Sequence, residues 1–146
     1  MRFIYIFPLL ALIAFKDCFA SFDWKKITTN KNGDTFYIDQ NIVKNNFKTV
    51  HINVLINSSP VAISSRSGIK SIIYKIETDC KKLRYKTLNS YFYSDFMAKG
   101  RKSISSEYYS LNFSSKGYWT YVSEDSPEQR VVENLCNNIK EKNVIE

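Results

Sequence analysis

The sequence has little of what most enzyme sites are built from, since its 146 residues include one histidine and four glycines. Any Ser-His-Asp set or Cys-His pair would depend on His51, which has no second histidine to accompany it. The four glycines form no phosphate-binding loop, and neither an HExxH sequence nor a paired-carboxylate motif is present. These absences argue against an enzyme and predict no cofactor, metal or small-molecule substrate. Only a carboxylate pair assembled from distant parts of the chain stays open.

The only long apolar run stands at the N-terminus. Residues 3–15 are 13 consecutive apolar residues, whereas a membrane-spanning helix needs about 20. Arg2 precedes the run, and Cys18 and Ala20 follow it at the small-residue positions of a cleavage site. This layout is typical of a secretory signal and predicts export with cleavage after Ala20.

Export defines the mature chain. Residues 1–20 are expected to be the signal peptide and residues 21–146 a single domain with no transmembrane segment. Cys18 follows Phe-Lys-Asp, whereas a lipidation signal has small and apolar residues before its cysteine. We therefore expect no lipid anchor and a location in the periplasm or outside the cell.

Removal of the signal leaves two cysteines, Cys80 and Cys136. A catalytic cysteine would need a histidine base, and a structural zinc would need four ligands, which two cysteines and one histidine do not supply. An even number of cysteines in an exported chain indicates a disulfide. We predict that Cys80 and Cys136 are bonded.

Alternating apolar and polar residues predict an antiparallel sheet. The expected strands are residues 22–28, 35–39, 48–56, 69–80, 82–94, 101–111 and 117–122. Trp24 is interpreted as a core anchor and His51 as a surface histidine. Asn32-Gly33 predicts a tight hairpin in which both residues take positive φ. Residues 39–46 are expected to form a loop or a single helical turn, and residues 57–68 a loop.

The period changes near the C-terminus, where a helix is predicted. Ser126 suits the N-cap, Pro127 the first helical position, and Gln129 completes a capping box. An apolar stripe recurs every three or four residues and includes Cys136. Cys80 lies at the end of a strand on its apolar side, so both cysteines should face one core. The fold class is therefore α+β: an antiparallel meandering sheet of about six strands, with a C-terminal helix packed on one face and tied to it by the disulfide.

Several segments, taken in order from Trp24 to Cys136, resemble the surface-adhesin protein E family. The most specific parts are the Asp79-Cys80 pair, the Met-x-x-Gly of residues 97–100 and the closing Ser-Pro…Cys segment. The resemblance implies a six-stranded antiparallel sheet whose concave face is disulfide-linked to the helix. It also implies a non-enzymatic adhesin that binds host matrix or serum proteins, such as vitronectin, laminin and plasminogen, and that forms homodimers.

One departure from the family keeps a second function open. The family's adhesin is a lipoprotein held at the outer membrane, and this chain lacks a lipidation signal. The alternative is a soluble periplasmic inhibitor or envelope-interaction protein that inserts a loop, residues 57–68, into a partner. Surface display favours the adhesin, and free periplasmic protein favours the alternative.

Positive charge concentrates in residues 81–102. The mature chain loses two basic residues and one acidic residue with the signal, which leaves 19 basic and 13 acidic residues and a net charge of +6. Residues 81–102 alone hold seven basic residues against Asp95, which is also +6. This segment is either a solvated face or a patch for an anionic partner; export argues against nucleic acid. The candidate partner-binding residues are Lys82, Arg84, Lys86, Lys99, Arg101 and Lys102, of which the first three are expected on a solvent-facing strand surface.

Overall fold

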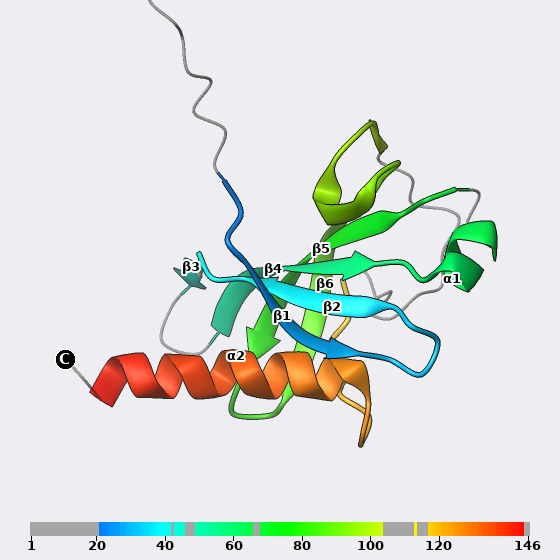
Figure 1. The fold of residues 1–146 in the computed structure, drawn as a ribbon. Coiled ribbons are helices and arrows are strands. Elements are labelled where there is room, and N and C mark those ends of the chain that lie inside the picture. The colour runs from blue at the N-terminus through cyan, green and yellow to red at the C-terminus, as the bar shows by residue number, and fades with distance from the viewer. Residues whose placement is uncertain are drawn as a thin grey trace, which may run out of the picture.

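An antiparallel sheet crossed on one face by a long C-terminal helix forms the domain (Figure 1). The structure is a computed structural model that describes residues 21–41, 43–45, 49–65, 68–103, 113 and 117–144. The strands are β1 (Trp24–Thr29), β2 (Thr35–Asp39), β3 (Val43–Asn45), β4 (Thr49–Asn57), β5 (Ser71–Asp79), β6 (Arg84–Tyr93), β7 (Lys102–Ser103) and β8 (Thr120–Tyr121). The helices are α1 (Pro60–Ser65), the 3-10 helix η1 (Phe96–Ala98) and α2 (Pro127–Val144).

The strands follow one another across the sheet in the order β1-β2-β4-β5-β6-β7, and every pair is antiparallel. Two short strands lie off this path: β3 pairs with β4, and β8 pairs with β6. The predicted α+β fold with its meandering sheet and C-terminal helix is confirmed. Successive side chains of a strand point to opposite faces of the sheet, and one of these faces packs against α2.

The core fills the space between the sheet and α2. Phe36 and Val54 from the sheet, and Val131 and Leu135 from the helix, are completely buried. Each such side chain contributes roughly 1.5–3 kcal/mol through burial. The opposite side of the sheet, which α2 does not cover, is called the outer face below.

The disulfide lies at the edge of this core, as predicted. Cys80 follows β5 and Cys136 lies in α2, and the two are bonded with their Cα atoms 5.5 Å apart. The start of α2 also agrees with the predicted capping residues. The Ser126 hydroxyl accepts the Gln129 N–H at 3.1 Å, and the Gln129 side chain accepts the Asp125 N–H at 2.7 Å. The cap and the disulfide together fix the helix on the sheet.

Local predictions failed where side chains or tertiary contacts determine the backbone. The β1–β2 hairpin exists, but of its two turn residues only Gly33 has positive φ, at 90°. The Asn30 carboxamide accepts the N–H groups of Asn32 and Asp34, and these bonds hold a longer turn. Trp24 is not a core anchor; it lies half-buried in register with Asp39, which places it on the outer face.

Two segments predicted to be irregular contain regular structure. Residues 43–45 form β3 rather than a loop or helical turn, because they pair with residues 49–51 of β4. Residues 60–65 form α1, so the stretch 57–68 is not a simple loop. Of the predicted strand 101–111, residues 102 and 103 are in β7, and residues 104–111 lie outside the described residues.

Candidate partner-binding surface

Strand β6 separates the candidate basic residues into two groups. Lys82, Arg84 and Lys86 lie at its start, whereas Lys102 pairs with Tyr93 at its end. The strand is ten residues long, which at 3.3 Å per residue is about 30 Å. The six residues therefore do not form one continuous patch.

The first group is a set of ion pairs on the outer face, called the ion-pair ladder, made of Glu77, Asp79, Arg84, Lys86 and Trp119. Lys86 Nζ lies 2.8 Å from Glu77 Oε2, and Arg84 Nε lies 3.0 Å from Asp79 Oδ2. Both cations also lie over the Trp119 ring, with Arg84 Cζ 4.6 Å and Lys86 Nζ 4.8 Å from its centroid. Two cations face two carboxylates, so the ladder carries no net charge.

The ladder shifts the titration of both carboxyl groups. For Glu77, burial raises the pKa, but hydrogen bonds from Lys86 and Thr49 and the charges of Lys86 and His51 outweigh burial and lower it. For Asp79, burial again raises the pKa. The hydrogen bond and charge of Arg84, together with hydrogen bonds from two backbone N–H groups, outweigh burial and lower it. Both carboxylates are therefore stabilised in their charged form.

Arg84 and Lys86 are less free than an exposed strand face would leave them. They lie on the sheet face opposite α2, but their side chains are only 21% and 24% exposed, and each is held by an acid. Lys82 is exposed in the turn before β6, where its backbone N–H donates to Asp79. His51 faces outward as predicted, with Nε2 4.0 Å from Glu77 Oε2.

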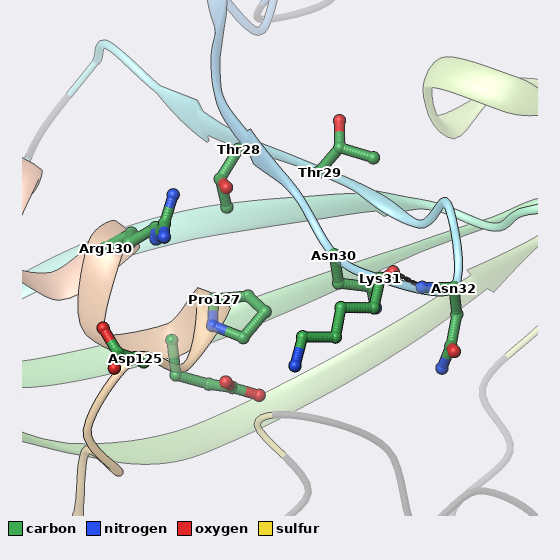
Figure 2. Close-up of a pocket in the computed structure, with 9 residues that line it drawn as sticks. Thr28, Thr29, Asn30, Lys31, Asn32, Asp125, Pro127 and Arg130 are labelled. Carbon is green, nitrogen blue, oxygen red and sulfur yellow. Dashed lines mark hydrogen bonds between the residues drawn. The ribbon is translucent and has the colours of Figure 1, made fainter.

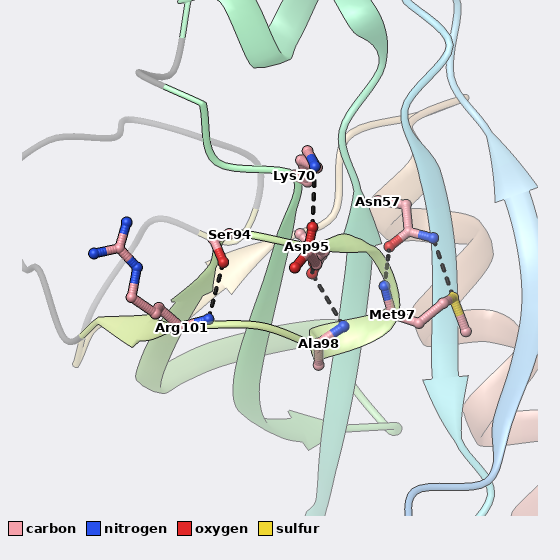
Figure 3. A network of polar contacts seen from close by, with 8 residues as sticks. Asn57, Lys70, Ser94, Asp95, Met97, Ala98 and Arg101 are labelled. Carbon is pink, nitrogen blue, oxygen red and sulfur yellow. Dashed lines mark hydrogen bonds and ion pairs between the residues drawn. The ribbon is translucent and has the colours of Figure 1, made fainter.

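The second group surrounds residues 94–101, called the 94–101 loop. This loop contains η1 and packs on the outer face against β4 and β5 (Figures 1 and 3). The Met97 N–H donates to Asn57 Oδ1 at 3.0 Å, and Asn57 Nδ2 donates to Met97 Sδ at 3.1 Å. The Ala98 N–H donates to Ser71 Oγ at 3.0 Å, and the Ser71 hydroxyl donates to the Asp95 carbonyl. The loop is thus anchored at its centre to two neighbouring strands.

Backbone strain marks the same loop. Met97 and Ala98 have φ of 56° and 58°, a left-handed conformation that is costly for residues with a side chain. Gly100 has φ of 74°, and a Cβ at this position would lie 2.5 Å from Asp95 Oδ2. Below the loop, Leu55 and Ile73 are buried although their strand positions face outward. Burial of these two side chains and the bonds from Asn57 and Ser71 offset the strain.

The 94–101 loop presents aromatic and cationic side chains. Phe96 is 45% exposed, and Lys70 Nζ lies 5.9 Å from its ring centroid and 3.0 Å from Asp95 Oδ1. Lys99 and Arg101 are exposed and have no ion-pair partner among the residues that the structure describes. The Arg101 N–H donates to Ser94 Oγ at 2.9 Å, which fixes the backbone below its guanidinium (Figure 3).

Strands β6 and β7 extend this area. Lys102 Nζ lies 3.9 Å from the Tyr91 ring centroid. Burial and the neighbouring Tyr91 raise the pKa of Tyr93, so its hydroxyl stays protonated. A hollow of about 310 Å³ lies beside Tyr93, Arg101 and Lys102. We call Phe96, Lys99, Arg101, Lys102 and Tyr91 the basic loop surface.

A larger hollow of about 420 Å³ lies between the β1–β2 turn and the start of α2 (Figure 2). Lys31 and Arg130 face it together with Asp125 and Glu128, so positive and negative charges balance. None of the candidate residues line it. Across the described ranges, no three His, Cys, Asp or Glu side chains are grouped as a metal site would require. In the same part of the chain, no helix has the length and apolar character needed to cross a membrane.

Sequence reasoning missed Trp119 and the 94–101 loop contacts. Trp119 was only part of a predicted aromatic strand, and nothing local to it indicates that it packs on Arg84 and Lys86. Asn57 and Ser71 lie 40 and 27 residues from the loop residues whose N–H groups they accept. Gly100 was the one local signal of an irregular loop, because glycine is the residue that most readily adopts positive φ.

Comparisons with known proteins agree with this fold. The sequence profile of the surface-adhesin protein E family matches residues 24–137. Haemophilus influenzae protein E in crystal form II is similar in structure, with a TM-score of 0.59 and 17% identity over 79% of this chain and 87% of that chain. Protein E from non-typeable Haemophilus influenzae has a TM-score of 0.55 and 18% identity over 80% of this chain and 78% of that chain. No curated protein sequence matches this chain. The profile match covers most of the sequence, and the chain therefore belongs to the surface-adhesin protein E family.

Proposed function

We propose that this chain is an exported, non-enzymatic binding protein of the adhesin type that attaches to large protein partners, such as host matrix or serum proteins. Membership of the surface-adhesin protein E family supports this class of function. The basic loop surface supports a location for the contact. Lys99 and Arg101 are exposed and unpaired within the described residues, whereas Arg84 and Lys86 are neutralised in the ion-pair ladder.

The single observation that carries the proposal is the rigid presentation of the basic loop surface. Asn57, Ser71 and Ser94 hold the loop backbone before any partner arrives. A partner therefore avoids much of the cost of ordering the loop, which is a main cost of association. Aromatic and arginine side chains are the types that carry most binding energy at interfaces, and Phe96 and Arg101 supply both. Acidic segments of a partner suit the surplus of cations.

The proposal is tested with the mature chain, residues 21–146, on immobilised vitronectin, laminin and plasminogen. A triple variant, Lys99→Glu, Arg101→Glu and Lys102→Glu, lowers the net charge from +6 to zero. We expect it to lose binding. Wild-type binding should weaken between 0.15 M and 1 M salt, as the Debye length falls from about 8 Å to about 3 Å.

A matched control separates local charge from total charge. Lys25, Lys26 and Lys31 are exposed on the β1–β2 hairpin, away from the basic loop surface. Their reversal to Glu changes the net charge by the same amount and should leave binding largely intact. Equal losses in the two triple variants, or binding that does not respond to salt, would contradict the proposed surface.

A further inference from the structure

We propose that the outer face also holds a binding site for an uncharged sugar ring of a glycan, in the hollow lined by Asn41, His51, Asn53 and Lys75. The hollow measures about 140 Å³. One water occupies about 30 Å³ of liquid, so the space equals four or five waters. It accommodates one edge of a single ring. This site is separate from the basic loop surface and does not depend on the proposed adhesin function.

A break in strand pairing creates the hollow. Along one edge of β4, strand β2 pairs as far as Val54, and β3 pairs from His51. Ile52 and Asn53 therefore have no strand partner on that side within the described residues. On the other side Asn53 pairs with Lys75 of β5, so these two side chains lie next to each other on the outer face. The backbone opening is bordered by polar side chains.

A buried carboxylate orients the amides at this opening. Asp39 is only 3% exposed, and its Oδ1 accepts both the backbone N–H and the side-chain Nδ2 of Asn41 at 3.1 Å. Its Oδ2 accepts Nδ2 of Asn53 at 3.4 Å. A carboxylate only accepts hydrogen bonds, so it determines which end of each amide faces it. The carbonyl oxygens of Asn41 and Asn53 then have no donor among the described residues.

Lys75 supplies the complementary group. Its side chain is exposed and has no hydrogen bond or ion pair with any described residue. The opening thus combines two unpaired acceptors with one unpaired donor. A sugar hydroxyl both donates and accepts, so neighbouring hydroxyls on one ring satisfy such a mixture. A purely anionic group would leave both amide oxygens unpaired.

An aromatic pair lies on the same face of the sheet, next to Asp39. Trp24 is in register with Asp39, so its ring is on the same face as the hollow. Phe22 stacks on it with ring centroids 4.8 Å apart and is 41% exposed. Aromatic rings bury large apolar area while leaving polar groups nearby in water. The C–H face of a sugar ring is the apolar surface that such a pair contacts.

The surrounding charges favour an uncharged ligand. Asp39 is the carboxylate that binds both amides, and Glu77, near His51, is already neutralised by Lys86. Lys75 is the one unpaired cation there among the described residues. Asp39 and Lys75 balance each other, so the opening has no surplus charge that would attract a charged sugar. An acidic sugar would also bring its carboxylate near Asp39, which disfavours it relative to a neutral sugar.

The test is an NMR titration of the ¹⁵N-labelled mature chain with the methyl glycosides of glucose, galactose and mannose, and with glucuronate as the anionic comparison. The mature chain has two tryptophans, which give two indole N–H signals. We expect saturable shifts of the Trp24 signal with at least one neutral glycoside and none of the Trp119 signal. Glucuronate should bind more weakly.

Point variants locate the site. Lys75→Ala and Asn53→Ala each remove one hydrogen bond to the sugar, which should weaken binding by about 2- to 10-fold. Lys75 is exposed, so its replacement should not disturb folding, and Lys25→Ala on the other face is the matched control with unchanged affinity. Absence of a saturable shift with all three neutral glycosides, tighter binding of glucuronate, or full affinity in both site variants would overturn the proposal.

Discussion

The Cys80–Cys136 bond should contribute about 4 kcal/mol to the free energy of unfolding. The bond closes a loop of 57 residues, counting both cysteines, since their sequence separation is 56. The chain-entropy relation then gives a loss of about 14 cal/mol/K in the unfolded state, or about 4 kcal/mol at 25 °C. Domains of this size have total stabilities of about 5–15 kcal/mol. Loss of the bond should therefore remove a large part of the stability.

Urea unfolding of the mature chain, followed by tryptophan fluorescence and circular dichroism, measures this contribution. The samples are the oxidised wild type, the reduced wild type and the double variant Cys80→Ala, Cys136→Ala. With an m-value of about 2 kcal/mol/M, the midpoint should fall by about 2 M. The reduced wild type keeps both side chains, so it separates the bond from packing. The double variant should be slightly less stable again, because Cys136 is only 3% exposed and alanine leaves a space there.

Two results would refute this reasoning. Two titratable thiols in the mature protein without reductant would show that the bond is absent. Equal urea midpoints for oxidised and reduced protein would show that the bond forms but does not restrict the unfolded chain as the loop length requires. Thiol titration in denaturant distinguishes the first result from the second.

Three further predictions follow from the backbone, the ion-pair ladder and the N-terminus. Gly100→Ala should cost more than the roughly 1–2 kcal/mol expected for left-handed φ alone, because its Cβ would clash, whereas Gly68→Ala, with φ of 82° and open space, should show only the φ cost in urea unfolding. The lowered pKa of Glu77 contributes stability that is present above its unfolded pKa and lost as pH falls through its folded pKa; urea midpoints at pH 7 and pH 3 should differ less in Glu77→Gln than in the wild type. Intact mass of the exported protein should show cleavage after Ala20 and no lipid; a mass that retains residues 1–20 would contradict this.

The disulfide could be predicted from the sequence because strand alternation and helical spacing independently placed the two cysteines on the side that faces the core. Strand alternation placed Cys80 with Ile76 on the apolar side, and helical spacing placed Cys136 on the stripe of Leu135. Both assignments depend only on local geometry, which a strand or helix imposes at every residue. The structure confirms the bond and the α+β arrangement around it. Local patterns gave the wrong element for residues 43–45, which pair with residues 49–51 of β4, and for residues 60–65, which form α1.

The count of charges overestimated the free positive charge. Residues 81–102 exclude Glu77 and Asp79, which precede the turn and pair across it with Lys86 and Arg84. A hairpin register for this stretch would have predicted both pairs, because opposite charges directly across an antiparallel pair attract. The information was therefore present in the sequence, but it required the pairing of two strands rather than the composition of one segment. Among the residues that the structure describes, the cations after Tyr93 have no such neighbours in the sheet.

The position of the 94–101 loop follows from two apolar residues on the wrong face. Leu55 and Ile73 pair across β4 and β5 on the outer face, where exposed apolar side chains would lose about 1.5–3 kcal/mol each relative to burial. The loop after β6 packs over β4 and β5 on this face, despite the left-handed backbone at Met97 and Ala98. Gly100 and Arg101 follow η1 closely in the sequence. The packing of η1 on β4 and β5 therefore also fixes the cations of the basic loop surface at the end of the sheet. A variant that shortens one member of this apolar pair, such as Ile73→Ala, should for this reason lower stability and also weaken partner binding. It should do so although residue 73 is buried and does not contact the partner.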